Sequence, residues 1–229
     1  PIDYIPHVFS HAEIRLLFEK SNSLFLMKSF PKSSLISFPA IIRLLYSTGI
    51  RIGEALGLQN RDVNMENHCI IIRHTKNNHQ RIAPINESLE KVLQQYLYYR
   101  NLIDRDNIDS PHSPFFVTST GNQIKAKSLS GWFSKLLDLS GICRNTPNMG
   151  YSIHTLRHTA CVHSMMKLHS EGLDMYAYLP VISKFMGHLH IPDTERYLRQ
   201  TVEMYPELES IDNEISKNII KTTKQPNEE

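Results

Sequence analysis

The order of apolar and polar residues predicts a chain built mostly of helices. Ser10 and Glu13 have the spacing of a capping box, which predicts a helix from Ser10 to about Lys20. A dense apolar run that begins at Ala40 predicts a buried helix ending near Gly49. Further helices are predicted over residues 54–56, 87–101, 129–139, 154–168 and 180–186.

Two short β-rich runs interrupt this helical pattern, at residues 69–74 and 81–85. They flank the polar tetrapeptide Lys76-Asn77-Asn78-His79, and an Asn-rich segment between two such runs predicts a β-hairpin. Residues 115–117 predict a strand or an extended segment before a turn. We therefore expect a mainly α domain with a small antiparallel β-sheet.

The 229 residues suffice for one domain with appendages, and no Pro/Gly-rich linker separates two folded halves. The expected parts are an extended linker (1–10), one folded domain (11–202) and a helical tail (203–229). In the tail, Ile211, Ile215 and Ile219 are four residues apart and so share one face of a helix. The chain begins with proline rather than methionine, so we expect it to be a fragment of a longer protein.

The net charge of +2 hides an uneven distribution. The tail holds seven acids and three bases, which leaves residues 1–202 with 22 bases and 16 acids. A basic body suits a polyanionic partner such as nucleic acid. An ordinary solvated surface explains these numbers almost as well, so charge alone does not decide between the two.

Several classes of protein are disfavoured. Cys69, Cys143 and Cys161 lie far apart without ligand spacing, which predicts a reducing compartment and no disulfide framework. The sequence has no apolar run of membrane-spanning length and no signal peptide.

The residues that carry chemistry lie in four separate segments. Tyr197 follows the Gly-His pair of MGHLHIPDTERYLRQ by nine residues, and the other segments are LLYSTGIRIGEALGL, RHTKNNHQR and HTLRHTA. Cleavage of a phosphodiester by a protein nucleophile needs cations on the non-bridging oxygens and an acid for the departing oxygen. Arginine suits the first of these tasks because its fork of donors fits phosphate oxygens. The candidates in chain order are Arg51, Lys76, His154, Arg157, His188 and Tyr197.

These four ordered motifs closely resemble the catalytic domain of the tyrosine recombinases, the phage-integrase family, and the resemblance covers about residues 5–200. It implies the family's catalytic-domain fold and makes Tyr197 the nucleophile, with Arg51 and Arg157 as phosphate clamps. It also implies that His154 contacts the phosphate or transfers a proton, and that His188 hydrogen-bonds the scissile phosphate. No metal, nucleotide or other cofactor is expected.

The resemblance also places Lys76 on the hairpin as the acid that protonates the leaving 5′ oxygen, and it suggests DNA-backbone contacts for His79 and Arg81. We expect His158 to support the fold and to point away from the site. A zinc pair of His154 and His158 is the rival interpretation, but the glutamate of an HExxH motif and a clear third ligand are missing.

Structural alternatives exist for several candidates. Arg51 could be an exposed arginine at a helix start, Lys76 an exposed turn lysine, and His188 a hydrogen-bonded histidine at a helix end. Tyr205 is the nearest rival nucleophile, but Pro206 follows it and it lacks the nine-residue spacing.

By this resemblance the chain is a site-specific DNA recombinase that cuts and rejoins strands through a 3′-phosphotyrosyl link. The long interval between Arg157 and His188 resembles integrases and transposases of mobile elements. The implied partner is double-stranded DNA at specific sites, with self-assembly into a synaptic tetramer, no membrane, and a bacterial cytoplasmic, nucleoid-associated location. A missing N-terminal core-binding domain would precede residues 1–10. The alternatives are a type IB topoisomerase and a catalytically silent DNA-binding regulator.

Overall fold

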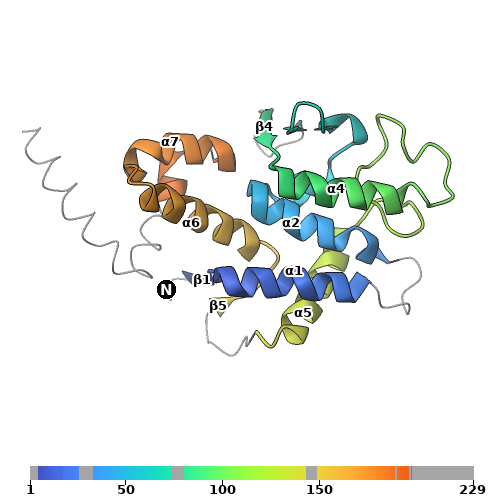
Figure 1. Ribbon diagram of the computed structural model, residues 1–229, viewed down its shortest axis with the longest axis horizontal. Helices are drawn as coiled ribbons and strands as arrows, with labels where there is room; N and C mark the ends of the chain where they lie inside the picture. The colour runs from blue at the N-terminus through green and yellow to red at the C-terminus, as the bar shows by residue number, and fades with distance from the viewer. Residues whose placement is uncertain are drawn as a thin grey trace, which may run out of the picture.

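The computed structural model describes residues 5–25, 33–73, 80–142, 149–188, 190–195 and 197. Most of these residues are helical, and two small sheets complete the fold (Figure 1). The predicted fold class, mainly α with a small antiparallel sheet, is therefore confirmed. The elements are β1 (Ile5–Pro6), α1 (His11–Phe25), η1 (Ser34–Ile36), α2 (Phe38–Thr48), α3 (Ile52–Leu56), η2 (Asn60–Asp62), β2 (Val63–Asn64), β3 (Cys69–Ile72), β4 (Arg81–Pro84), α4 (Glu87–Arg100), α5 (Ala126–Leu139), β5 (Met149–Gly150), α6 (Thr155–Ser170) and α7 (Met175–Met186).

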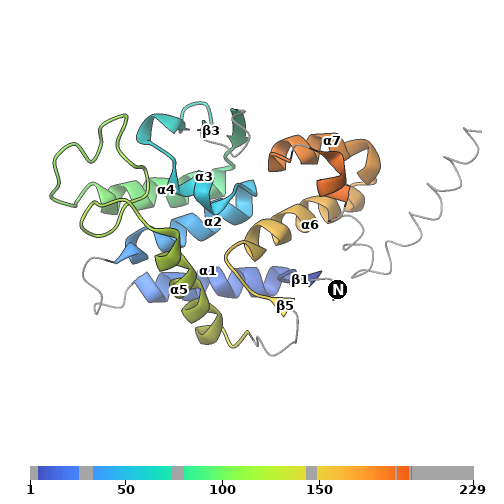
Figure 2. The ribbon, with the colours of Figure 1, turned by 180° about the vertical axis from the view of Figure 1, so that it is seen from behind.

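Helix α2 is the centre of the core. It packs against α1, α4 and α6, and Figure 2 shows it from behind between α1 and α4. Its side chains Phe38, Ile41, Ile42 and Leu44 have 0% exposure, and burying each contributes about 1.5–3 kcal/mol. The helix ends as predicted at Gly49, whose positive φ of 60° closes the last turn with a hydrogen bond to the Leu45 carbonyl.

The predicted hairpin forms one side of the three-stranded sheet β2-β3-β4. Strand β3 pairs antiparallel with β4, so that Ile72 lies opposite Arg81. Burial alternates along β3, with Ile70 and Ile72 turned into the core. The hairpin tip, residues 74–79, lies outside the described residues.

Helix α1 begins with the predicted capping box, in which the Ser10 N–H donates to Glu13 and the Glu13 N–H donates to Ser10. The predicted end near Lys20 is wrong, because α1 continues to Phe25. Hydrogen bonds within α1 and from α2 stabilise its polar continuation: the Ser21 hydroxyl donates to the Phe18 carbonyl and accepts from Arg43 of α2.

The segment before α1 is extended, as predicted. Strand β1 pairs in parallel with β5. Phe9 has 0% exposure, and its N–H donates to the Thr159 hydroxyl over 3.1 Å. The core therefore reaches upstream to Phe9, while the boundaries at 10 and 202 stay predictions and the tail 203–229 lies outside the described residues.

Helices α6 and α7 form a second, smaller apolar cluster of Cys161, Met165, Leu179, Ile182 and Met186. The prediction placed the start of α7 near Pro180, but the helix begins at Met175 and holds this proline inside it. Pro180 lies on the exposed face, and inside a helix it removes one backbone hydrogen bond and crowds the carbonyl four residues earlier. Within the described residues, no helix is long and apolar enough to cross a membrane.

Candidate active site

Arg51 stands where the chain turns from α2 into α3. Its backbone N–H donates to Oε2 of Glu54 over 2.8 Å, and its Nη1 donates to Oε1 of the same carboxylate over 3.1 Å. Its Nη2 donates to the Gly187 carbonyl over 3.1 Å. The side chain keeps 29% exposure, so this predicted clamp is accessible to a ligand.

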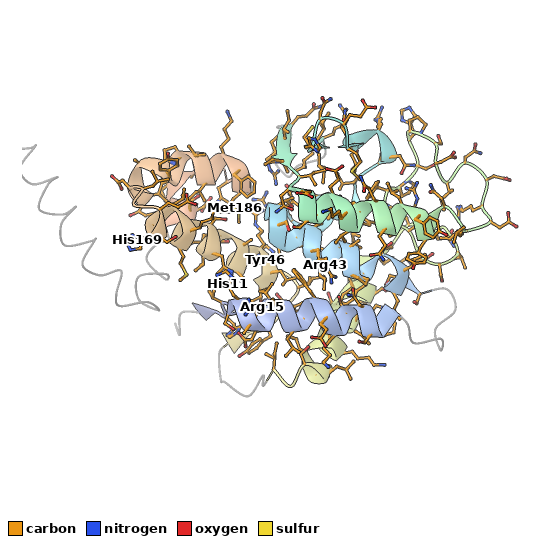
Figure 3. The ribbon with its side chains drawn as sticks, viewed as in Figure 1. His11, Arg15, Arg43, Tyr46, His169 and Met186 are labelled. Carbon is orange, nitrogen blue, oxygen red and sulfur yellow. The ribbon has the colours of Figure 1, made fainter. Side chains whose placement is uncertain are left out.

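Arg157 lies in the first turn of α6 and is 2% exposed. Its Nη1 donates to the Gly49 carbonyl at the end of α2, and its Nη2 donates to the Met186 carbonyl at the end of α7 over 2.6 Å. Met186, labelled in Figure 3, marks this meeting of helix ends. Burial and the nearby charge of Arg51 lower the pKa of Arg157 to about 10, so the guanidinium stays charged at neutral pH.

His188 follows Gly187, whose φ of +67° turns the chain out of α7. The Nδ1 of His188 shares a 2.8 Å hydrogen bond with the hydroxyl of Thr194, which is completely buried. Burial, reinforced by the charges of Arg157 and Arg51, lowers the pKa of His188 to about 4. The ring is therefore neutral at pH 7 and presents one donor and one acceptor nitrogen.

Tyr197 is half-buried and contacts two imidazole rings. It stacks on His188 with ring centres 5.5 Å apart and an interplanar angle of 12°, and its ring centre lies 4.9 Å from that of His158 at an angle of 35°. Burial raises the pKa of the Tyr197 phenol, against the opposing charge of Arg157 and a hydrogen bond with the Arg157 side chain. The predicted nucleophile and one predicted clamp are thus in direct contact.

His154 is the exposed residue just before α6, and its ring centre lies 4.8 Å from that of His158. Partial burial and the charges of Arg157 and Arg51 lower its pKa. The expectation that His158 points away from the site is wrong, because its ring lies between His154 and Tyr197. Burial and the nearby His154 lower the pKa of His158 to about 4.

The remaining predicted residues belong to the hairpin. Lys76 and His79 lie outside the described residues. Arg81, predicted as a DNA-backbone contact, has a side chain only 10% exposed, and both of its terminal nitrogens donate to Glu54. The structure therefore places Arg81 beside Arg51 and Gly187 at the base of the hairpin.

Two residues of the site were missed from the sequence. Glu54, whose side chain is 4% exposed, bonds to both Arg51 and Arg81, and Thr194 holds the His188 ring. The signal for Glu54 was its position three residues after Arg51, which is the spacing of a capping box. Nothing in the local sequence singled out Thr194, which comes close to His188 through the turn after α7.

The charges of the site are unbalanced in favour of an anion. Among the described residues, three guanidinium groups, of Arg51, Arg81 and Arg157, meet two carboxylates, Glu54, which bonds to two of them, and Asp193, which acts on His188. The lowered pKa values of the histidines keep these rings mostly neutral. A phosphodiester, which carries one negative charge and oxygens that fit an arginine fork, matches this excess. In the described ranges no cluster of three or more His, Cys, Asp or Glu side chains could hold a metal ion.

Comparisons with known proteins identify the family and the fold. Residues 8–204 match the model of the phage integrase family. The tyrosine recombinase XerC of Thermodesulfovibrio yellowstonii is 29% identical over 171 residues, which cover 72% of this chain and 52% of that relative. The chain thus spans about half the length of this relative.

Solved structures of recombinases share the fold, and two of them illustrate the likeness. A post-cleavage complex of XerH recombinase with its palindromic difH substrate has a TM-score of 0.67 at 21% identity, covering 91% of this chain and 54% of that one. The Tn1549 transposon integrase in complex with a circular intermediate DNA has a TM-score of 0.60 at 21% identity, covering 83% and 60%. Because the family model matches residues 8–204, most of the chain, the chain belongs to the phage integrase family, the tyrosine recombinases.

Proposed function

We propose that this chain is the catalytic part of a site-specific DNA recombinase, in which Tyr197 attacks the scissile phosphate. The observation that carries the proposal is the convergence of Tyr197, His188 and two arginines from separate elements onto one positively charged site. Arg51 approaches from the start of α3, Arg157 from α6, His188 from the turn after α7, and Tyr197 from the helical segment that follows this turn.

In the proposed step the phenolic oxygen of Tyr197 forms a bond to phosphorus while the bond to the 5′ oxygen breaks. The phenol gives up its proton, and the departing oxygen takes one and leaves as a 5′ hydroxyl. The 3′-phosphotyrosyl ester conserves the phosphodiester energy, so a 5′ hydroxyl of another strand can reverse the step without nucleotide hydrolysis. Arg51 and Arg157 stabilise charge on the non-bridging oxygens during both steps.

The histidines and the lysine have the proton-transferring and hydrogen-bonding roles in this proposal. His188 is neutral, and its Nδ1 is engaged by Thr194, so its other nitrogen can hydrogen-bond to the phosphate. His154 also has a lowered pKa and is proposed to contact the phosphate or transfer a proton. Lys76 is proposed to protonate the 5′ oxygen, an assignment that rests on its motif in the hairpin.

We also propose the partner, the assembly, the cellular location and the biological process. The partner is double-stranded DNA at specific recombination sites, and assembly there as a synaptic tetramer would bring two sites together for exchange. A bacterial cytoplasmic location on the nucleoid follows from such a substrate. The long segment between Arg157 and His188, together with the likeness in fold to a transposon integrase, supports integration or excision of a mobile element.

The test is covalent capture on nicked duplexes that carry the end sequences of the mobile element around the nick. Loss of the short fragment beyond the nick traps the 3′-phosphotyrosyl adduct, which a denaturing gel detects. The wild-type chain should form this adduct, whereas Tyr197→Phe should form none. Because the change removes one phenolic hydrogen bond, DNA affinity should move by less than about 1 kcal/mol.

The matched control is Tyr178→Phe, because Tyr178 is a half-buried tyrosine of α7. It should form the adduct at the wild-type rate. An adduct that persists in Tyr197→Phe would move the nucleophile to another tyrosine, with Tyr205 tested next. Binding without any adduct would favour a silent regulator. Relaxation of supercoiled plasmid without transfer to a second duplex would favour a topoisomerase.

A further inference from the structure

Arg81 occupies a position that links the hairpin to two predicted catalytic residues. It is the first residue of β4 and lies opposite Ile72, the last residue of β3. The segment that carries Lys76 connects these two residues, so Arg81 stands at the base of the hairpin. Its side chain is only 10% exposed.

The Arg81 guanidinium holds both oxygens of one buried carboxylate. Its Nη1 donates to Oε1 of Glu54 over 2.9 Å, and its Nη2 donates to Oε2 over 2.6 Å. This two-point pairing fixes the plane of the carboxylate, which a single bond would leave free to rotate. Burial alone would raise the pKa of Glu54, but the bonds and charges of Arg81 and Arg51 produce a net lowering.

The carboxylate that Arg81 fixes is also the anchor of Arg51. The Arg51 backbone N–H donates to Oε2 and its Nη1 donates to Oε1, so both oxygens are shared between the two arginines. A shift of Glu54 would therefore displace the Arg51 side chain, and with it the bond from Arg51 to the Gly187 carbonyl.

Arg81 also packs directly against the residue before His188. A methyl group added at Gly187 would lie 2.6 Å from Cζ and 2.7 Å from Nη1 of Arg81, so the guanidinium lies against the bare glycine backbone. Contacts between α7 and β4 bring the two together. One side chain thus supports Arg51 through Glu54 and His188 through Gly187.

We propose that Arg81 is a positioning residue for strand cleavage, which holds Arg51 and the His188 turn in register with the hairpin. The inference rests on the proposed function. It replaces a direct DNA contact for Arg81, because Glu54 engages both terminal nitrogens and Nε is itself buried.

The experiment measures the rate of adduct formation at saturating nicked duplex, together with DNA affinity at several salt concentrations. Arg81→Ala should slow the adduct step by ~10²-fold, the scale for a displaced catalytic group. Affinity and its salt dependence should not change. A phosphate contact would behave differently, since its loss would weaken binding and reduce the salt slope by about 0.9.

A second pair of variants tests the route through Glu54. If Arg81 acts through this carboxylate, adding Arg81→Ala to Glu54→Ala should slow cleavage by less than about threefold more, far from the product of the two effects. Arg81→Lys keeps the charge but not the two-point pairing, and it should give an intermediate rate. Full additivity, or a wild-type rate in Arg81→Lys, would overturn the proposal.

Arg73 provides the matched control. It follows β3 on the same hairpin and pairs with a buried carboxylate, Asp62, over 2.7 Å. Arg73→Ala should lower the melting temperature without slowing cleavage by the folded protein. Equal slowing in both variants would mean that loss of sheet stability explains the effect, and the inference would fail. A wild-type chain without any adduct is a different result, which refutes the proposed function itself before any variant is compared.

Discussion

Two buried carboxylates, Glu54 and Asp62, perform the same local task at neighbouring places in the fold. Each closes a capping box: Glu54 accepts the backbone N–H of Arg51 over 2.8 Å, and Asp62 accepts that of Gln59 over 2.9 Å. Each also accepts a bond from an arginine of the hairpin. Their side chains are 4% and 2% exposed, so burial does not distinguish them.

The difference lies in the arginines and in what these contact next. Among the described residues, Asp62 accepts from one arginine, through a bond from Nε of Arg73 to one oxygen, and that arginine is 31% exposed. Glu54 holds two arginines through both oxygens, and one of them continues to the Gly187 carbonyl beside His188. The same capping device closes a loop at Asp62 and assembles a site at Glu54.

This comparison shows how the cost of burying charge is used. A buried ion pair contributes little net stability, because desolvation offsets much of the attraction. The buried Asp62 links η2 to Arg73 at the end of β3. The buried Glu54 instead holds Arg51 at a defined place, where it can contact a ligand amid an excess of positive charge.

The largest expected effect separates the two carboxylates by function. Glu54→Ala should slow adduct formation by ~10²-fold, because Arg51 and Arg81 lose their shared anchor. Asp62→Ala should leave the rate of the folded protein within about twofold of wild type, because Arg73 and Gln59 lie outside the site and no catalytic group is displaced. The rates are measured on nicked duplexes well below both melting temperatures.

Both substitutions should destabilise the chain, which makes stability a necessary control. Removing one partner of a buried pair costs about 3–5 kcal/mol, and Glu54→Ala should approach this range. Asp62→Ala should cost less, about 1–3 kcal/mol, because the partly exposed Arg73 can turn to water. Equal loss of cleavage in the two variants would mean that Glu54 and Asp62 do not differ in their effect on catalysis.

Much of this site could be predicted from the sequence because its residues lie in ordered motifs. The spacing from His188 to Tyr197 and the HTLRH segment identified residues that the structure brings together. Glu54 was predicted only as the start of a short helix over residues 54–56. Its second task could not be predicted, because Arg81 reaches it from a strand that is distant in sequence.

The orientation of the His158 side chain could not be predicted from the sequence for a similar reason. Arg157 and His158 are adjacent on α6 and point to different sides of the helix, so only one was expected to face the site. Tyr197 reaches His158 because α7 packs on α6 through the cluster that includes Cys161 and Met165. The approach of the tyrosine is thus set by tertiary packing, which local periodicity does not record.

Two glycines allow a smaller and more selective perturbation of the contacts around Glu54. Gly187 and Gly172 both have positive φ, of 67° and 74°, so alanine costs about 1–2 kcal/mol of backbone strain at either position. Only at Gly187 does the added methyl meet a neighbour within 4 Å, the guanidinium of Arg81. Gly187→Ala should therefore slow cleavage by about tenfold as Arg81 leaves Glu54.

Gly172→Ala should lower the melting temperature without this kinetic effect. In a background of Arg81→Ala the three atoms nearest to the added methyl at Gly187 are absent, and its effect on the rate should largely disappear. A tenfold loss that survives in that background would show that Gly187 acts on His188 by itself, without Arg81.

The smallest expected effect is the pH dependence of the Glu54 contribution to stability. The folded pKa of Glu54 is lowered from 4.5, so the unfolded state binds its proton first as the pH falls. The stabilisation by this carboxylate is therefore fully present above about pH 4.5 and is lost as the pH falls through the folded value. Denaturant unfolding of wild type and Glu54→Gln between pH 3 and pH 7 should give a difference in unfolding free energy that is constant above pH 4.5 and shrinks below it.

Three histidines change the stability of both proteins over the same range. Burial lowers the pKa of His158, His163 and His188 to about 4, which destabilises both proteins between pH 6.5 and pH 4 but cancels in their difference. The matching series with Asp62→Asn measures the carboxylate that holds a single arginine. A difference for Glu54 that grew on acidification would mean that burial outweighs its two arginines, and the contrast between the two carboxylates would have to be reversed.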